Sequence, residues 1–395
     1  MFAKLPIYST VSRMASKGRW FSTEVLRKTP LHSLHVSRGA FMTGFGGWDM
    51  PLYYEDGIMK EHLHCRAEAG LFDVSHMLGV KITGADRVAF AEKITPAGVQ
   101  ELEEGQGALT SLPNENGGLI DDCIITNAGD HLFLVINAGH EEKDLPHMRS
   151  VLESSGLDAD FAPQEGKGIL ALQGPKAVDV MARLTDGVNF QEFKFMTGRN
   201  MAVNGVDCFV TRSGYTGEDG FELSCAGGDA EALAEALLSQ GEVEPVGLGA
   251  RDSLRLEAGL CLYGNDIDDS TTPMEAGLLW TINKRRRAEG GFVGSDVILQ
   301  QIKDKSHKRK KVGIVLSGKG PPPRSHDKLY NDEGEEIGEV TSGVFGPTAK
   351  KAVAMGYVKK QYAKKGTSIQ VQIRKKRFPM ETTGMPFVPA NFFKG

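Results

Sequence analysis

Two successive rounds of strand and helix patterns, followed by strands alone, constrain the fold of this 395-residue chain more than any other feature. In the first round, alternating or β-branched runs predict strands over residues 77–82, 119–126 and 131–137. Helical periods are predicted over 85–94 and 141–154. Such a mixture of strands and helices is typical of an α+β unit.

The second round repeats this mixture, and the character of the chain changes after Lys284. Strands are predicted over 168–172 and 208–211, and helices over 176–184 and 229–240. Beyond Lys284, turn residues separate four predicted strands, at 310–316, 338–342, 352–358 and 368–374. The patterns therefore predict an α+β protein with two α+β units and a small all-β domain.

The length supports a division into domains, because a domain usually holds roughly 100 to 200 residues. We expect a leader over 1–23, α+β units over 24–160 and 161–290, and the all-β domain over 291–395. Gly-Ser linkers and low-complexity tracts are absent. We therefore expect the units to pack closely rather than to move on tethers.

The leader has the composition of a mitochondrial transit peptide. Residues 1–23 contain no Asp or Glu, many Ser and Thr, and four basic residues, Lys4, Arg13, Lys17 and Arg19. The run Arg-Trp-Phe-Ser at 19–22 resembles a processing site with Arg shortly before the cut. This composition predicts import into the mitochondrial matrix, and the alternative is a plain disordered tail.

Removal of residues 1–21 should leave a folded and active protein, because a transit peptide is not part of the mature fold. Thermal melting of the truncated and full-length chains measures this. Loss of the cooperative melting transition on truncation would count against the transit-peptide interpretation.

Charge, hydropathy and cysteine usage argue against several classes of protein. The net charge of -5 opposes general attraction to nucleic acid or to an anionic membrane. No apolar run approaches the roughly 20 residues of a membrane-spanning helix. The 5 cysteines include no Cys-x-x-Cys pair, so neither a disulfide framework nor a zinc ribbon is indicated. The basic runs 284–287 and 308–311 are not interleaved with aromatic residues, and we expect both to be solvated.

Adjacent carboxylates at Asp121 and Asp122 interrupt an apolar strand just after the glycine turn at 117–118. Neighbouring side chains on a strand face opposite sides, so one carboxylate can point into a cavity. There it would be a candidate acid, base or stabiliser of a cation. The alternative is that both residues only cap a hairpin, and the spacing alone does not distinguish the two.

The segment 212–222 places glycines, Tyr215 and three carboxylates in a loop that enters a strand. Glycines let the backbone approach a ligand, and a buried Glu can accept two hydrogen bonds from an amidine-like heterocycle edge such as that of pterin. On composition alone, a surface turn is the favoured interpretation.

Two arginines, Arg251 and Arg255, lie four residues apart on a predicted helix over 249–257. Like charges at this spacing repel unless acids or an anionic ligand meet them. Salt bridges to nearby acids are the expected solution.

Other candidate residues receive structural interpretations. His62, His64 and Cys65 are ligand types without a second ligand pair, so no metal site is predicted. His76 is expected to be a hydrogen-bonded structural histidine. The glycine-rich segment 44–51 is expected to be a loop without a nucleotide-binding role. No P-loop or Gly-x-Ser-x-Gly elbow is present, which weakens NTPase and hydrolase interpretations.

Taken in order, these segments resemble the glycine cleavage T-protein family from about Leu26 to Phe393. The matching motifs are Leu-Phe-Asp-Val-Ser-His-Met at 71–77, Gly-Gly at 117–118 with Asp-Asp at 121–122, Ala-Leu-Gln-Gly-Pro at 171–175, Gly-Tyr-Thr-Gly-Glu-Asp-Gly at 214–220, Ala-Arg-Asp-Ser-Leu-Arg-Leu-Glu-Ala-Gly-Leu at 250–260 and Met-Pro-Phe-Val-Pro at 385–389. So many matches in order are specific, whereas spacing and composition alone do not indicate folate.

The resemblance implies a ring of three domains, with two ferredoxin-like α+β units, a C-terminal antiparallel β-barrel and folate in the central hole. It implies that Asp122 is the catalytic carboxylate, that Glu222 contacts the pterin and that Arg251 contacts folate. The other residues implied to line the folate slot are Tyr215, Asn137, Met77, Leu109, Trp280 and Phe392. Phe133 and Phe392 stand where some relatives carry Tyr, which puts the hydroxyl contacts there in doubt.

The resemblance also implies an activity in glycine catabolism. An aminomethyltransferase of this family passes the methylene carbon from the S-aminomethyl-dihydrolipoyl group of H-protein to tetrahydrofolate, releasing ammonia and forming 5,10-methylenetetrahydrofolate. Lipoylated H-protein is the implied partner, with the P- and L-proteins as indirect partners, and no metal is expected. A fixed carboxylate beside an iminium-like carbon would stabilise positive charge and manage a proton on folate nitrogen.

Other classes stay open. Folate-binding relatives in iron–sulfur assembly or transfer-RNA modification carry a Cys immediately before the Tyr of the Gly-Tyr-Thr-Gly-like motif, whereas this chain has Gly214 there. A non-catalytic binding module would be supported if Asp122 adjoined no cavity. A folate-dependent demethylating dehydrogenase would need room for a flavin domain, which this chain lacks.

Overall fold

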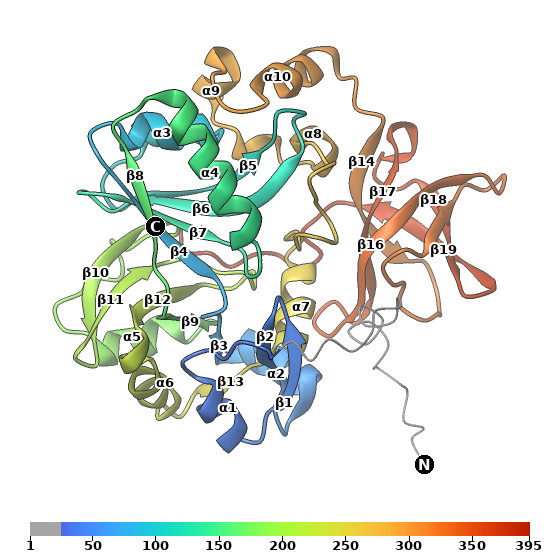
Figure 1. The fold of residues 1–395 in the computed structure, drawn as a ribbon. Helices are drawn as coiled ribbons and strands as arrows, with labels where there is room; N and C mark the ends of the chain where they lie inside the picture. Colours follow the sequence, from blue (N-terminus) through green and yellow to red (C-terminus); the bar gives the residue numbers. More distant parts are fainter. Residues whose placement is uncertain (1–24) are drawn as a thin grey trace.

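The computed structural model describes residues 25–395, so the predicted leader lies outside the described residues. Three β-sheet units surround a central region that contains helix α7, Leu248–Glu257 (Figure 1). The prediction of a mixed α+β protein with a C-terminal antiparallel β-barrel is confirmed. The predicted domain boundaries at 24–160, 161–290 and 291–395 stay a prediction.

The first unit is a five-stranded antiparallel sheet, in the order β5-β6-β7-β4-β8. Helices α3 and α4 lie over one face of this sheet (Figure 1), and apolar residues of both helices form one core with inward residues of the strands. Alternation along the strands produces this arrangement, because every second side chain faces the helices. The elements are β4 Leu78–Thr83, α3 Arg87–Ile94, β5 Gly107–Pro113, β6 Leu119–Asn127, β7 Leu132–Ile136, α4 Glu141–Ser155 and β8 Asp160–Pro163.

The second unit is a six-stranded sheet, in the order β10-β11-β12-β9-β3-β13, in which β3 and β13 pair in parallel. Its strand β9 is buried on both faces: Leu170 and Leu172 pack with α5 and α6, while Ile169 and Ala171 pack with Phe72 of β3. The elements are β3 Ala69–Asp73, β9 Lys167–Gln173, α5 Ala177–Leu184, β10 Gly198–Val203, β11 Val206–Thr211, β12 Gly220–Ala226, α6 Ala230–Leu238 and β13 Val243–Pro245. The chain thus passes from this sheet at β3 into the first unit at β4 and returns at β9, so the two units are interleaved.

The third unit is a closed antiparallel barrel, because β14 pairs with both β17 and β19. Aliphatic side chains such as Ile314, Val340 and Val371 fill its interior. The strands are β14 Arg309–Leu316, β15 Lys328–Tyr330, β16 Glu336–Gly346, β17 Lys351–Lys359, β18 Ser368–Ile373 and β19 Lys376–Thr383.

The expectation of a loop over 44–51 is wrong. Strands β1, Phe41–Phe45, and β2, Trp48–Tyr53, form an antiparallel hairpin. Gly46 and Gly47 make its two-residue turn with φ angles of 55° and 81°, which glycine adopts without strain. Glycine and proline within the strands hide the strand signal, but the Gly-Gly turn itself is a hairpin signal.

The remaining helices connect these units. They are α1 His32–Ser37, α2 Gly57–Ala67, α8 Pro273–Ala276, α9 Lys284–Glu289 and α10 Ser295–Asp304, together with short 3₁₀ turns at Val99–Glu101, Gly227–Asp229, Leu279–Thr281 and Lys360–Tyr362. Within residues 25–395, no helix is both long and apolar enough to cross a membrane.

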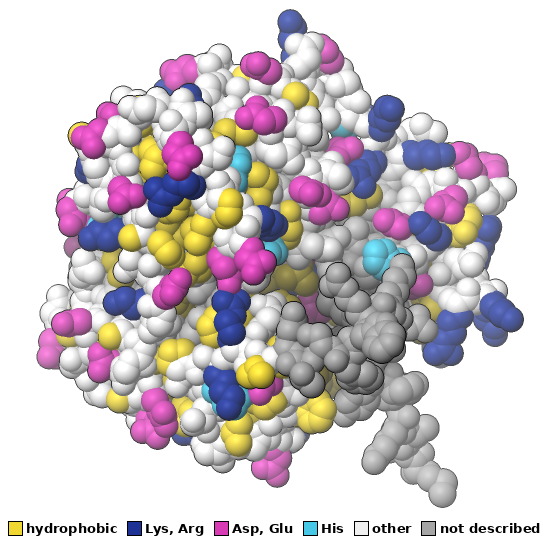
Figure 2. Space-filling model, viewed as in Figure 1, with side chains coloured by type: hydrophobic (Ala, Val, Ile, Leu, Met, Phe, Trp, Pro, Cys, Tyr) yellow, Lys and Arg dark blue, Asp and Glu magenta, His cyan; other side chains and the backbone are white. Residues whose placement is uncertain are grey.

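The expectation that the basic run of α9 forms a solvated face is wrong. Arg285 forms ion pairs with Glu92 and Glu101, and the buried Arg286 donates a hydrogen bond of 2.7 Å to the backbone oxygen of Glu92. These contacts fasten α9 to the first unit. On the face shown in Figure 2, cationic and anionic side chains are interspersed over the units.

Candidate functional site

One large cavity lies between the units and receives side chains from all three. Every residue that the resemblance assigned to the site lines this cavity: Met77, Leu109, Asp122, Asn137, Tyr215, Glu222, Arg251, Trp280 and Phe392. These residues come from strands β5, β6 and β12, from helix α7 and from connecting segments. The fold therefore brings together residues that are as far apart in sequence as Met77 and Phe392.

Strand β6 presents its two adjacent carboxylates to opposite sides. Asp121 is fully buried on the face that carries Cys123 and Ile125, which belong to the core of the first unit. Asp122 is partly exposed and lines the cavity together with Ile124. The hypothesis that one carboxylate faces a cavity agrees with this geometry, and Asp122 is that residue.

Asn137 bridges the two carboxylates at the end of β7. Its Nδ2 donates hydrogen bonds of 3.0 Å to Asp122 Oδ1 and 2.9 Å to Asp121 Oδ1, and its backbone N–H donates to Asp121 Oδ2 at 2.9 Å. His140 Nδ1 lies 2.8 Å from Asp121 Oδ1. The orientation of Asp122 therefore depends on a network that also holds Asp121.

The surroundings of Asp122 bring its pKa close to neutral pH. Burial, followed by the negative charge of Asp121, raises the pKa of Asp122 to about 7, while the hydrogen bond from Asn137 and the charge of Lys311 oppose this rise. A carboxylate with a pKa near the working pH can both accept and return a proton.

The loop between β11 and β12 is held from inside, so its interpretation as a surface turn is wrong. Arg212 is buried and donates hydrogen bonds to Asp219 at 2.9 Å and to the backbone oxygens of Phe190 and Phe193 at 2.7 and 2.6 Å. Thr216 is also fully buried. These bonds fix the loop that carries Tyr215.

Gly214 is required by the packing of this loop. A Cβ atom at this position would lie 1.8 Å from Oε1 of Gln173. Gln173 is fully buried, donates a hydrogen bond of 2.9 Å to the backbone oxygen of Ser213 and accepts one of 2.9 Å from Thr216. Because both ends of its amide are held, Gln173 could make room for a side chain only by breaking these bonds.

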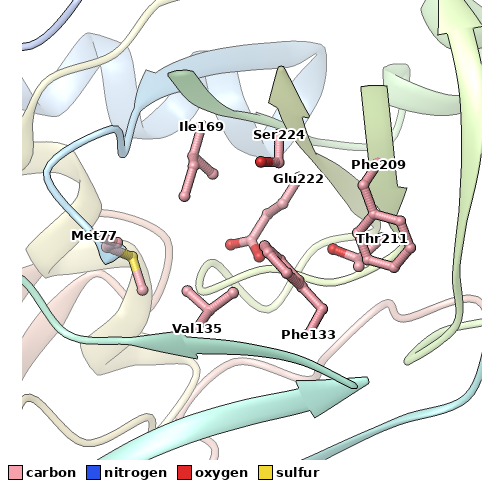
Figure 3. A pocket seen from close by; sticks show the side chains of 8 residues that line it. All are labelled: Met77, Phe133, Val135, Ile169, Phe209, Thr211, Glu222 and Ser224. Atoms are coloured by element: carbon pink, nitrogen blue, oxygen red, sulfur yellow. The ribbon is translucent and has the colours of Figure 1, made fainter. Parts of the chain in front are cut away.

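Glu222 points into a small, largely apolar pocket between the sheets of the first two units (Figure 3). The pocket is lined by Met77, Phe133, Val135, Ile169, Phe209, Thr211, Glu222 and Ser224. Ser213 Oγ donates a hydrogen bond of 3.0 Å to Glu222 Oε2. Burial raises the pKa of Glu222, and the charge of Arg251 and this hydrogen bond oppose the rise. Such a carboxyl group would gain from a ligand that donates hydrogen bonds to it.

The two arginines of α7 have different surroundings. Arg255 is buried and paired with Asp252 at 2.8 Å and Asp266 at 2.6 Å, so the expected salt bridges are present there. Arg251 lies over the ring of Tyr215, with its Cζ 4.7 Å from the ring centroid, and its buried Nη1 has no hydrogen-bond partner among the described residues. Arg251 therefore has an unused donor at the cavity wall.

The two phenylalanines in doubt keep aromatic contacts. Phe133 packs edge-on against Phe209 with ring centroids 5.2 Å apart, and Phe392 stacks on Phe195 at 4.2 Å. Tyr215 donates a hydrogen bond to the backbone oxygen of Cys261. Ring packing thus persists at Phe133 and Phe392 without the hydroxyl group.

His62 and His76 have different surroundings. His62 is fully buried and lies 2.7 Å from Ser253 Oγ and 2.8 Å from Thr348 Oγ1, so its role is structural. The expectation of a hydrogen-bonded His76 is not met at Nδ1, which has no partner within residues 25–395. Burial lowers the pKa of His76 to about 4, so its ring is neutral at pH 7.

The sequence patterns did not single out two residues that lie near the site, His140 and Asp144. His140 and Asp144 lie beside Asp121, and the three side chains offer ligand-type atoms within 4.8 Å of one another. A single Asp inside a helix pattern is ordinarily a solvent-facing residue. The only signal in the sequence was the position of His140, three residues after Asn137 at the strand end. This position could have suggested that its side chain lies near the carboxylates.

Comparison with known proteins places the whole chain in one group. The family model described as "GCVT N-terminal domain" matches residues 31–286, and the model "Glycine cleavage T-protein C-terminal barrel domain" matches residues 309–389. Mitochondrial aminomethyltransferases from Pisum sativum and Gallus gallus are 49% and 48% identical over 98% and 94% of this chain, and over 97% and 94% of their own lengths. The crystal structure of glycine cleavage system aminomethyltransferase T from Bartonella henselae has a TM-score of 0.88 at 42% identity, covering 93% of this chain and 100% of that one.

Proposed function

This chain belongs to the glycine cleavage T-protein family and is a mitochondrial aminomethyltransferase of the glycine cleavage system, and we propose that Asp122 is the carboxylate on which its one-carbon transfer depends. The observation that carries this proposal is the position of Asp122. It lies on the wall of the cavity that also exposes Glu222 and Arg251, and its pKa of about 7 suits proton transfer.

The acceptor substrate of the family is tetrahydrofolate, and the cavity contains side chains that can form hydrogen bonds with it. In the proposed arrangement, Glu222, which also lines the large cavity, accepts hydrogen bonds from the amidine-like edge of the pterin there. Arg251 turns its unused donor toward the folate, with Tyr215 stacked against its guanidinium. Met77, Leu109, Asn137, Trp280 and Phe392 line the remainder of the slot.

The one-carbon donor in this proposal is the aminomethyl group carried on the lipoyl arm of H-protein. Lipoylated H-protein is then the direct partner, and the P- and L-proteins are indirect partners. We place this exchange in the mitochondrial matrix, and we propose no metal, nucleic-acid or membrane partner.

The bond changes of the proposed reaction give Asp122 a role. Two nitrogens of tetrahydrofolate each form one bond to the aminomethyl carbon and each lose a proton. The carbon–sulfur bond breaks with its electron pair leaving on the lipoyl sulfur, and the carbon–nitrogen bond breaks with its electron pair leaving on the amine nitrogen. One of the two protons ends on the lipoyl thiol and the other on the released ammonia. The carbon carries iminium-like positive charge on this route. An ionised Asp122 beside it stabilises that charge and accepts a proton that a folate nitrogen loses.

Turnover should rise with pH through about 7, because the ionised form of Asp122 is the active form and its pKa is about 7. Well below that pH, protonation should reduce kcat roughly ten-fold per pH unit. A profile of kcat from about pH 5.5 to 9, with melting recorded at each pH, measures this limb. A kcat that is flat across neutrality, in a protein that stays folded, would remove Asp122 from the role of base.

The geometry at Gly214 weighs against the related class that has Cys at this position. A side chain there would collide with the buried Gln173, whose amide is held at both ends. An inert binding module is disfavoured because Asp122 adjoins the large cavity.

A further inference from the structure

We propose that Asp144, buried behind Asp122 on helix α4, is a positioning residue for the transfer reaction: as a neutral carboxylic acid it donates a hydrogen bond to Asp121, and Asp121 in turn holds Asn137 against Asp122. This inference rests on the proposed role of Asp122. Asp144 contacts no substrate in this arrangement, and its effect passes through two other side chains.

The first argument is the complete burial of Asp144 without a donor. The residue has no exposed surface, and neither of its carboxylate oxygens receives a hydrogen bond from any donor among the described residues. An ionised carboxylate in such a place would cost many kcal/mol. A proton on Asp144 removes that charge and creates a donor.

The second argument is the residue that Asp144 faces. Asp144 and Asp121 present oxygen atoms to each other within a group whose ligand-type atoms lie within 4.8 Å. Two facing carboxyl groups can both be satisfied only when one of them carries a proton. The proton must therefore reside on one of the two.

The hydrogen bonds of Asp121 decide which residue carries the proton. Asp121 already accepts three: from Asn137 Nδ2 at 2.9 Å, from the Asn137 backbone at 2.9 Å, and from His140 Nδ1 at 2.8 Å. These donors favour the charged form. Burial raises the pKa of Asp121, but the bonds from His140, Asp144 and Asn137 outweigh this and lower it.

The charges around Asp144 favour its neutral form. Burial, followed by the charge of Asp121, raises the pKa of Asp144 to about 10, with Asp122 adding to the rise and Lys143 opposing it. Asp121 and Asp122 come from strand β6, and Lys143 and His140 belong to the same helix as Asp144. Among these groups Lys143 opposes protonation of Asp144, and its Nζ donates a hydrogen bond to the backbone oxygen of Ile120.

A divalent cation between Asp121, His140 and Asp144 is the competing explanation, since their atoms are ligand types. The existing bonds disfavour it. A cation bound through His140 Nδ1 would break the bond that this nitrogen makes to Asp121 Oδ1. A proton on Asp144 satisfies this residue and leaves the hydrogen bonds of Asp121 to Asn137 and His140 in place.

The connection to the reaction is the shared amide of Asn137. Its Nδ2 donates to Asp121 Oδ1 and to Asp122 Oδ1 at 2.9 and 3.0 Å. If Asp121 loses its bond from Asp144, its carboxylate can turn and take the amide with it. A small displacement of a catalytic group can reduce turnover by up to about a hundred-fold, while substrate binding elsewhere is unaffected.

The test compares Asp144→Asn, which keeps a donor and removes the titration, with Asp144→Leu, which removes the donor. Asp144→Asn should keep kcat within about three-fold of wild type, and Asp144→Leu should lower kcat at least about ten-fold with an unchanged KM for tetrahydrofolate. A residue that matters only for folding would not produce this split between kcat and KM, nor rescue by Asn.

Infrared spectroscopy reads the proton directly and does not need activity. At about pH 8.5, between the pKa of about 7 for Asp122 and that of about 10 for Asp144, the wild-type protein should show a carboxylic-acid C=O stretch that is missing from Asp144→Asn. The band should persist in Asp122→Asn. If Asp144→Leu does not fold, this comparison of wild type with Asp144→Asn still decides.

Three results would overturn the proposal: identical infrared spectra of wild type and Asp144→Asn, a folded Asp144→Asn as slow as Asp144→Leu, or stoichiometric Mn²⁺ binding that Asp144→Asn abolishes. Failure of the proposed function has a different signature. In that case Asp122→Asn would keep its activity while the infrared band of Asp144 remained.

Discussion

Replacement of Asp122 by Asn should lower kcat by roughly a hundred-fold or more while the affinity for tetrahydrofolate changes little. The substitution keeps the shape of the side chain and removes its charge and its capacity to accept a proton. Because the lost interaction strengthens only as positive charge develops on the transferred carbon, the effect belongs in kcat. A hundred-fold loss corresponds to about 2.7 kcal/mol of transition-state stabilisation. Single-turnover measurement with folate titration separates the two quantities.

Asp121→Asn is the matched control, since the same change is made one residue away on the opposite face of β6. Its loss of kcat should be smaller, on the order of the ten-fold expected for Asp144→Leu, because Asp121 acts on Asp122 only through Asn137. It should lower the melting temperature more than Asp122→Asn does, because Asp121 is buried and accepts three hydrogen bonds. A larger kcat defect in Asp121→Asn, or near-wild-type turnover in Asp122→Asn, would mean that the wrong carboxylate has been chosen.

Glu222→Ala and Arg251→Ala should each weaken tetrahydrofolate binding by roughly ten- to a hundred-fold. Each removes a charged hydrogen bond to the ligand, which is worth about 1.5 to 3 kcal/mol. Neither should reduce stability greatly: Glu222 is a carboxyl group whose burial raises its pKa, and Arg251 has a donor without a partner. Titration calorimetry and thermal melting measure the two effects.

Arg183→Ala is a suitable control for the arginine, because Arg183 is half-exposed and paired with Glu242 outside the cavity. It should leave folate binding unchanged. Unchanged titrations for Glu222→Ala and Arg251→Ala, in proteins of normal stability, would remove both residues from the folate slot.

Strong periodicity made much of the fold predictable. The pattern over 119–126 corresponds to β6, and the helix predicted over 141–154 corresponds to α4, each within a residue or two at its ends. Three of the strands that the patterns did not predict have clear physical reasons. β19 contains Pro379, the hairpin strand β2 contains Pro51, and β3 is short and buried along its whole length, so it shows no alternation.

The site was predictable only in part. Alternation on a strand allowed one of two adjacent carboxylates to face a cavity but left hairpin capping open, and the resemblance indicated Asp122. Salt bridges to nearby acids were expected at both arginines and are present at Arg255, whose buried partner Asp266 lies 11 residues further along the chain. The pattern did not indicate that Arg251 would instead keep an Nη1 without a hydrogen-bond partner among the described residues. The role of Asp144 could not be predicted either, because its burial results from the packing of α4 against β6, which the sequence pattern does not indicate.

The most direct test of the account is an assay of 5,10-methylenetetrahydrofolate and ammonia formed from aminomethylated H-protein and tetrahydrofolate, with wild type and Asp122→Asn side by side. The account predicts equal amounts of the two products with wild type, dependence on both substrates, and a rate at least about a hundred-fold lower with Asp122→Asn. Absence of product with folded wild type, or equal rates for the two proteins, would contradict it.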